Sequence, residues 1–523
     1  MKFKKTRVIF ICTNLLLAII GCIRIYRATN WGVWAFSDSA SYFSAARNLM
    51  EGQGMIIKKA NGGVEFFQQF PPLYPFVLGV AAKLLNDPFA AARWINIFAF
   101  GAFLFLSGQN MFVHTKGLVI SLAAPALLLV SPMMITNFTG AMTEPIFFVL
   151  MMLSFLLVYC LIKTPDTRLQ ILYVIISALL PVTRYAGIVV VAANSFLLLA
   201  FMQTSFKKRL SFFFISVFIS ALPTLIWLAN MYTLTDRIGG RSVQMAATFF
   251  GNFCNALEVM YGILPSYLAY HGIYEDIVSS GTRFVFFLVG LSGLLCLSIS
   301  MLLKRSGAKI SKDLALEKYF IFPLHACAFF IFIAFSYSIT LRSYVIDQRQ
   351  LSPLIPITLL FIIDSLSVIR SALKNHRALF SVIILVLFAF VVRFTYFSSR
   401  NLVRNLYENG DGFTARQYQQ SGIIDVIKSI PEDKPIISNS AGFILLHDNR
   451  YPLQVDQFNQ HKFGSGNTYG ERTFREREAA LVLLLSDFHN YYGARSEELL
   501  SALTEGLNVA YQDAVGAIFY YPE

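Results

Sequence analysis

The chain alternates between apolar runs of about 20 residues and short loops that carry lysine and arginine. A helix of about 20 apolar residues is long enough to cross the hydrocarbon core of a bilayer. Of the 523 residues, 56% are hydrophobic and 14% are charged, whereas about a quarter of the residues in a soluble protein are charged. The pattern therefore predicts an α-helical polytopic membrane protein and excludes a soluble globular fold.

The net charge of +13 is explained by the same architecture. Lysine and arginine collect in the cytoplasmic loops of membrane proteins, where they set the orientation of the spans. Membrane lipids are therefore the expected surroundings, and no nucleic-acid partner is predicted. The six cysteines form no C-x-x-C pair, and five of them lie in apolar runs. Neither a disulfide framework nor a metal cluster is expected from them.

The first 26 residues superficially resemble a secretory signal peptide. Their apolar run is too long for a signal sequence and no A-x-A cleavage site follows, so we expect an uncleaved first helix. Four basic residues precede this helix and place the N-terminus in the cytoplasm; they are Lys2, Lys4, Lys5 and Arg7. The stretch that follows the helix is then outside.

The apolar segment Pro72–Leu85 decides the topology, because it is short for a span. If it crossed the membrane, the basic loops of the following chain would lie outside, against the positive-inside rule. If it lies at the outer interface as an amphipathic or re-entrant helix, those loops lie inside. We therefore predict about eleven spans, with the N-terminus in and the C-terminus out. The spans are expected at residues 8–26, 90–113, 117–136, 145–162, 169–183, 187–203, 210–231, 283–303, 319–340, 351–369 and 378–397.

Two domains follow from this topology. Residues 1–397 form a transmembrane module, with a first outer loop at 27–89 that holds interfacial helices and a second large outer loop at 232–282. Residues 398–523 are polar enough to form a small extracytoplasmic soluble α/β domain. Within it, residues 481–488 and 515–521 are predicted to be strands and residues 496–506 a helix.

Two acids on the outer side can carry chemistry. Asp38 follows the first span, where a carboxylate can act as a general base on an incoming hydroxyl. The alternative is that Ser37 or Asp38 caps the next helix. Glu144 begins a later span and can face Asp38 across a cavity, where it would orient the acceptor or tune its partner's pKa. The alternative is a favourable acid at a helix N-terminus, with Thr143 at the cap and Pro145 in the first turn.

Several arginines also fall on the outer side, which the positive-inside rule makes unexpected. They are Arg47, Arg93, Arg184, Arg342 and Arg349. Planar guanidinium groups suit phosphate oxygens, so the set predicts a site for a lipid phosphate. The alternative for each arginine is snorkelling to lipid headgroups or pairing with a nearby acid. The sequence contains no Walker-type loop, G-x-S-x-G, Cys/His nucleophile pattern or metal-spaced histidines.

The motifs around these residues resemble a known family. In chain order they are D-S-x-x-Y-F-x-x-A-R-N-L-x-x-G at Asp38–Gly52, F-P-P-L-Y-P at Phe70–Pro75, A-R-W-I-N at Ala92–Asn96, T-E-P at Thr143–Pro145, T-R-Y-A-G at Thr183–Gly187 and R-Q-L-S-P-L-I-P at Arg349–Pro356. This order resembles the C-type glycosyltransferase superfamily, in particular the branch of protein O-mannosyltransferases and lipid A aminoarabinose transferases. The resemblance covers the whole chain. It implies a sugar donor on a polyprenyl phosphate, no nucleotide cofactor, and a divalent metal that is compatible but not required.

The resemblance also assigns roles to individual residues. Asp38 matches the catalytic acid of the first outer loop, and Glu144 matches the acid of the second. The phosphate-binding set comprises Arg93, Arg184 and Arg349, and the acceptor side of the first loop comprises Tyr42, Arg47 and Tyr74.

Three positions depart from the family pattern. Ser39 stands where many relatives have a second acid. Gln69 and Phe70 stand where the aminoarabinose branch has Glu and Lys. These departures favour a simple hexosyl donor over aminoarabinose.

The combined prediction is a hexosyltransferase in the cytoplasmic (inner) membrane with its active site on the extracytoplasmic face. It would move a glycosyl group from a polyprenyl-phosphate sugar to a hydroxyl of a lipid, glycan or protein acceptor, with inversion and with Asp38 as general base. The main rival is a lipid or sugar transporter or flippase, which should show internal repeats and broken helices; the sequence shows no such repeat. A non-catalytic membrane scaffold is a third alternative.

Overall fold

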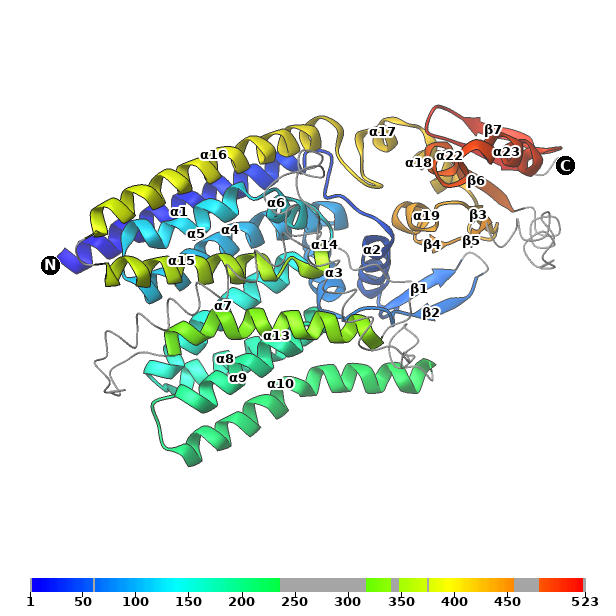
Figure 1. The fold of residues 1–523 in the computed structure, drawn as a ribbon. Coiled ribbons are helices and arrows are strands. Elements are labelled where there is room, and N and C mark those ends of the chain that lie inside the picture. Colours follow the sequence, from blue (N-terminus) through cyan, green and yellow to red (C-terminus); the bar gives the residue numbers. More distant parts are fainter. Residues whose placement is uncertain are drawn as a thin grey trace.

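The computed structural model describes residues 2–59, 62–235, 317–339, 348–373, 376–455 and 479–520, and the structural statements below concern these residues. Long helices form a bundle at one end of the molecule, and a mixed α/β part lies at the other end (Figure 1). The two termini lie at opposite ends (Figure 1). The expected span 283–303 and nearly all of the expected outer loop 232–282 lie outside the described residues.

The bundle contains eleven of the described helices, short and long. They are α1 (Lys2–Ala28), α4 (Pro88–Thr115), α5 (Leu118–Val130), α6 (Pro132–Thr139), α7 (Glu144–Lys163), α8 (Thr167–Thr183), α9 (Gly187–Phe201), α10 (Phe206–Thr235), α13 (Glu317–Ile339), α15 (Leu354–Ala372) and α16 (Arg377–Asn409). Five of them, α1, α4, α7, α10 and α16, are long and apolar enough to cross a membrane. The chain is therefore a multi-pass membrane protein, while the total of eleven spans and their orientation stay predictions.

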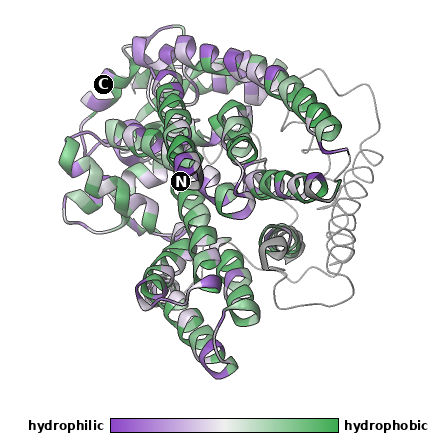
Figure 2. Ribbon diagram, turned by 90° about the vertical axis from the view of Figure 1, so that its left-hand side faces the viewer, coloured by the Kyte–Doolittle hydropathy of each residue, from purple (hydrophilic) through white to green (hydrophobic). Residues whose placement is uncertain are grey.

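The helices divide into a buried centre and an apolar periphery. In the most apolar stretch of α7, 72% of the residues are buried inside the protein, compared with 17% in α10 and 6% in α16. Figure 2 shows long runs of hydrophobic residues along the helices of the bundle. Exposed apolar residues on a soluble protein would be a liability, so we interpret the outer faces of α10 and α16 as lipid-facing.

The prediction of a single span at 117–136 is wrong. The structure breaks it into α5 and α6, which are bent by 62°. The break falls at Ser131, whose backbone is extended, as the following Pro132 requires. Two side chains satisfy the freed polar groups: Ser131 Oγ accepts from the Met134 N–H at 3.4 Å, and Arg24 donates to the Leu129 carbonyl at 3.1 Å.

The α/β part is built from the loop at residues 27–89 and the C-terminal residues. The loop contributes α2 (Ser37–Met50), β1 (Ile56–Lys59), β2 (Val64–Phe66) and α3 (Leu73–Leu85). The short helix α14 (Gln348–Leu351) precedes α15. The C-terminal residues contribute α17 (Arg416–Gln420), α18 (Ile423–Ser429), β3 (Ile436–Ser438), α19 (Ala441–Asp448), β4 (Arg450–Tyr451), β5 (Leu453–Gln454), β6 (Ala480–Leu484), α22 (Leu485–Tyr492), α23 (Ser496–Thr504), β7 (Asn508–Gln512) and β8 (Gly516–Tyr520).

A five-stranded sheet organises the C-terminal residues. Its order is β5-β3-β6-β8-β7, with β5, β3 and β6 parallel and β6, β8 and β7 antiparallel. The strand expected at 481–488 ends earlier, at Leu484, and the helix α22 begins at the next residue. Residue 398, the expected domain boundary, lies inside α16, which continues to Asn409.

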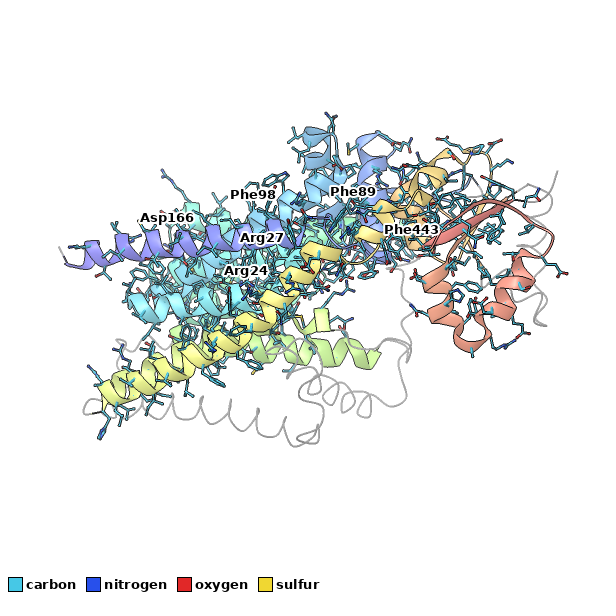
Figure 3. The ribbon with its side chains drawn as sticks, turned by 90° about the horizontal axis from the view of Figure 1, so that it is seen from above. Arg24, Arg27, Phe89, Phe98, Asp166 and Phe443 are labelled. Carbon is cyan, nitrogen blue, oxygen red and sulfur yellow. The ribbon has the colours of Figure 1, made fainter. Side chains whose placement is uncertain are left out.

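The loop at residues 27–89 and the C-terminal residues form one joint, which the sequence did not predict. Strand β1 pairs with β2 on one side and, in parallel, with β4 on the other, with Lys59 opposite Tyr451. Arg47 on α2 donates to the Leu446 carbonyl of α19 at 2.6 Å. Figure 3 shows Phe89 and Phe443 at this joint, far from Asp166 at the opposite end of the bundle.

Candidate active site

Asp38 lies in the first turn of α2, in the loop at residues 27–89. Its Oδ2 faces an Arg349 guanidinium nitrogen at 3.4 Å, and the two side chains are 36% and 32% exposed. The N-cap position of α2 is Phe36, and no side chain caps the helix. The capping alternative for Ser37 or Asp38 is therefore wrong. The carboxylate is held by a cation that comes from α14, more than 300 residues later in the chain.

Glu144 forms a second ion pair with Arg184. Glu144 is the first residue of α7 and its side chain is 2% exposed, while that of Arg184 is 18% exposed. The guanidinium of Arg184 contacts Glu144 Oε1 directly and also donates to Thr143 Oγ1 at 3.3 Å. Thr143 occupies the N-cap position of α7, yet its side chain makes no cap hydrogen bond. The structure therefore contains the pair between Arg184 and Glu144 that was one of the alternatives for this arginine.

Tyr42 lies within electrostatic range of both ion pairs. It is buried on α2, and its ring centroid lies 5.0 Å from that of Phe70 and 5.2 Å from that of Tyr74. Burial raises the pKa of Tyr42 well above its usual range, and the charges of Asp38 and Glu144 raise it further, while Arg184 and Arg349 act in the opposite direction. All four charged groups are therefore close enough to act on this one hydroxyl, which remains protonated.

Tyr74 packs edge-on against the Tyr42 ring. It is fully buried, and its hydroxyl has no hydrogen-bond partner among the described residues. Burial raises the pKa of Tyr74 strongly, and the charge of Glu144 adds to the effect. The proline-fixed start of α3 thus brings a second phenol towards the buried ion pair.

The structure does not bring Arg93 or Arg47 to the carboxylates. Arg93 donates to the Tyr26 carbonyl at 2.9 Å and lies over the Tyr26 ring, so it closes the C-terminal end of α1. Arg47 binds the Leu446 carbonyl, as described above, at the C-terminal end of α19. Burial lowers the pKa of Arg47 to about 10. Both arginines complete helix ends, where cations are favourable.

A cavity of about 730 Å³ opens beside Asp38. Its walls come from α2, the β1–β2 hairpin, the segment after β2, Phe413, α19 and the β4–β5 connection. The lining includes Gln68 and Gln69 from the first loop and Gln454 from the C-terminal residues. Gln69 is one of the departures from the family pattern. Gln454 could not be predicted from the sequence, because the first loop and the C-terminal residues meet through the pairing of β1 with β4.

Asp38 and Glu144 belong to no metal-binding group among the described residues. Among the described residues, no three His, Cys, Asp or Glu side chains lie close enough to hold a metal ion together. Asp38 and Glu144 each face a guanidinium.

Comparison with known proteins identifies the fold. No protein-family model matches the sequence, and no curated protein matches it. Among solved structures, ArnT from Cupriavidus metallidurans bound to undecaprenyl phosphate is similar, with a TM-score of 0.52 at 12% identity over 98% of this chain and 97% of that chain. The Archaeoglobus fulgidus oligosaccharyltransferase in complex with Zn and sulfate gives a TM-score of 0.56 at 12% identity, covering 97% and 73% of the two chains. Its apo form gives 0.53 at 11% identity, covering 98% and 74%.

Both similar proteins are C-type glycosyltransferases, and the alignments run over nearly the whole chain. Identities of 11–12% are informative about fold alone. The chain thus has the fold of the C-type glycosyltransferases, as the order of its motifs predicts.

Proposed function

We propose that the protein transfers a glycosyl group from a polyprenyl-phosphate sugar to an acceptor hydroxyl on the outer side of the cytoplasmic membrane. The observation that carries the proposal is Asp38 at the wall of a 730 Å³ cavity, facing Arg349, in a fold shared with a transferase crystallised with undecaprenyl phosphate. A carboxylate that is partly exposed to a substrate-sized cavity can reach an acceptor hydroxyl.

The proposed reaction is a single displacement at the anomeric carbon. The acceptor oxygen attacks this carbon from the side opposite the phosphate, and the acceptor proton passes to the Asp38 carboxylate. The bond between the anomeric carbon and the phosphate oxygen breaks, and its electron pair stays on the phosphate. The products are the glycosylated acceptor and a polyprenyl phosphate, and Asp38 then returns its proton to water.

Arg184 and Arg349 are the cations available to the donor phosphate. Both act on Tyr42, and each is paired with a carboxylate. Guanidinium groups bind phosphate oxygens bidentately, and cations that meet the charge developing on a leaving group lower the barrier. Arg349 would also hold the Asp38 carboxylate in position for the proton transfer. Arg93 would act only through the end of α1.

The donor is proposed to be a simple hexosyl derivative, because Gln69 and Phe70 replace the Glu and Lys of the aminoarabinose branch. The orientation that puts the α/β part outside follows from the basic loops at the other end of the bundle. Transport without transfer is the rival, and it predicts that the donor crosses the membrane chemically unchanged.

The test is Asp38→Asn in the full-length protein, reconstituted with a radiolabelled polyprenyl-phosphate hexose and a cell-envelope extract from a strain that lacks the protein. We expect normal membrane insertion and a loss of transfer of about 10²–10⁴-fold, the typical contribution of a general base. Asp433→Asn is the matched control, since Asp433 is an exposed acid of the C-terminal residues. Wild-type transfer rates in Asp38→Asn would remove the centre of the proposal.

A further inference from the structure

The cavity beside Asp38 faces away from the membrane-spanning helices. None of its described lining residues belongs to the five helices that are long and apolar enough to cross a bilayer. A lipid tail held between those helices would have no place in it. The cavity therefore suits the substrate that arrives from the water side.

The chemistry of the lining is that of a saccharide site. Three carboxamides line it, Gln68, Gln69 and Gln454, and each can donate and accept hydrogen bonds. The half-buried rings of Phe66 and Tyr451 also line it. Sugar rings present hydroxyls at their edges and C–H groups on their faces. Amides and aromatic rings match these two kinds of surface.

The charges of the lining argue against an anionic ligand. Lys59 is the single cation among the described lining residues, and it is paired with Glu65 at 3.0 Å. Asp38, the other acid of the lining, is paired with Arg349. Phosphate and carboxylate ligands are recognised by arginine or lysine, and the one cation among the described lining residues is already paired with a carboxylate.

One amide of the lining is incompletely satisfied. Gln68 donates through Nε2 to Glu65 Oε1 at 3.0 Å. Because a carboxylate only accepts, this contact fixes which end of the amide is the nitrogen. The remaining atom, Gln68 Oε1, is buried without a hydrogen-bond partner among the described residues. Leaving a buried acceptor unmet is costly, and a hydroxyl of a bound ligand is the kind of donor that this oxygen lacks.

We infer that this cavity is the acceptor subsite and that it binds a neutral, hydroxyl-rich saccharide, held jointly by the first outer loop and the C-terminal residues. The inference rests on the proposed transferase function, because the ligand is an acceptor only if a sugar is transferred to it. It narrows the acceptor classes left open by the sequence to glycans without phosphate or carboxylate groups.

The test measures binding in the absence of donor. Detergent-purified full-length protein is applied to an array of neutral tetrasaccharides, phosphorylated and uronic-acid oligosaccharides, and serine- or threonine-containing peptides. We expect binding to at least one neutral tetrasaccharide and to neither other class. Gln69→Leu combined with Gln454→Leu should weaken that binding about tenfold, for two lost hydrogen bonds. Gln512→Leu, an exposed glutamine of β7 outside the cavity, should leave it unchanged.

Binding to anionic oligosaccharides, to peptides or to nothing on the array would overturn the inference, and so would a double variant that binds like the wild type. Gln69→Leu alone, at an exposed position, serves as a second variant should the double variant elute as an aggregate in size-exclusion chromatography. Failure of the transferase proposal is a separate result: wild-type protein would then bind the saccharide without releasing polyprenyl phosphate.

Discussion

Replacing either partner of the Glu144–Arg184 pair should destabilise the protein, and the two replacements should do so unequally. Breaking a buried ion pair costs about 3–5 kcal/mol, because it leaves an uncompensated charge. In Glu144→Gln the stranded group is the guanidinium of Arg184, which is 18% exposed and keeps its hydrogen bond to Thr143. We therefore expect about 2–3 kcal/mol for this variant.

Arg184→Met should cost more, at the upper end of about 3–5 kcal/mol, because the stranded Glu144 carboxylate is only 2% exposed. The double variant removes both charges and should recover about 2 kcal/mol or more relative to the sum of the single variants. Unfolding is measured in mixed detergent micelles by tryptophan fluorescence.

The exposed pair Arg404–Glu408 on α16 provides the matched control. Its side chains are 74% and 50% exposed, and Arg404→Met combined with Glu408→Gln should change the stability by less than about 1 kcal/mol. If the effects of Glu144→Gln and Arg184→Met simply add in the double variant, the two groups are not coupled. The assignment of a buried ion pair beside Tyr42 would then be wrong.

Two further outcomes test the joint and the packing of the site. The ring of His447 is buried against Phe443, and burial first, then the charge of Arg47, lower its pKa to about 4. Between pH 6.5 and 4 the unfolded chain then binds more protons than the folded protein, so the free energy of unfolding should fall by about 2–3 kcal/mol as the pH drops through this window. In His447→Gln, thermal melts should show a weaker dependence of stability on pH over the same window. Gly140→Ala should destabilise the protein by about 1–3 kcal/mol, because a Cβ there would lie 2.2 Å from the Trp34 ring. Gly117→Ala is its control, since a Cβ at Gly117 would meet only one backbone oxygen, at 3.9 Å. Equal melting temperatures for the two variants would contradict the packing argument.

Sequence reasoning reached the membrane helices because their signal is local. The apolar runs of α7 and α16 can be recognised from their length and composition alone. The order of the motifs was sufficient to predict the fold. The break at Ser131 was missed, although Pro132 marks it. Proline is frequent in membrane helices, so its presence alone does not separate a break from a continuous span.

The partners of the charged residues could not be read from the sequence. Asp38 meets Arg349 and Glu144 meets Arg184 only after the bundle has assembled, and nothing local separates these arginines from Arg93, which closes the end of α1. The motif around Arg47 suggested the acceptor side of the loop, whereas its side chain binds the α19 carbonyl end. A motif therefore located the segment that carries the site, but tertiary contacts decided which side chains face it.

The pairing of β1 with β4 gives the C-terminal residues a structural role in the cavity beside Asp38. Arg450, the first residue of β4, is buried and donates to the carbonyls of Ile430 and Pro431, which fixes the strand to the turn between α18 and β3. The other side of that strand meets Lys58 and Lys59 of β1. Without β4, β1 would keep only β2 as a neighbour, and the cavity would lose its wall of α19, β4 and β5. The C-terminal residues are thus part of the cavity itself, and the geometry around Asp38 depends on a contact made about 400 residues later in the chain.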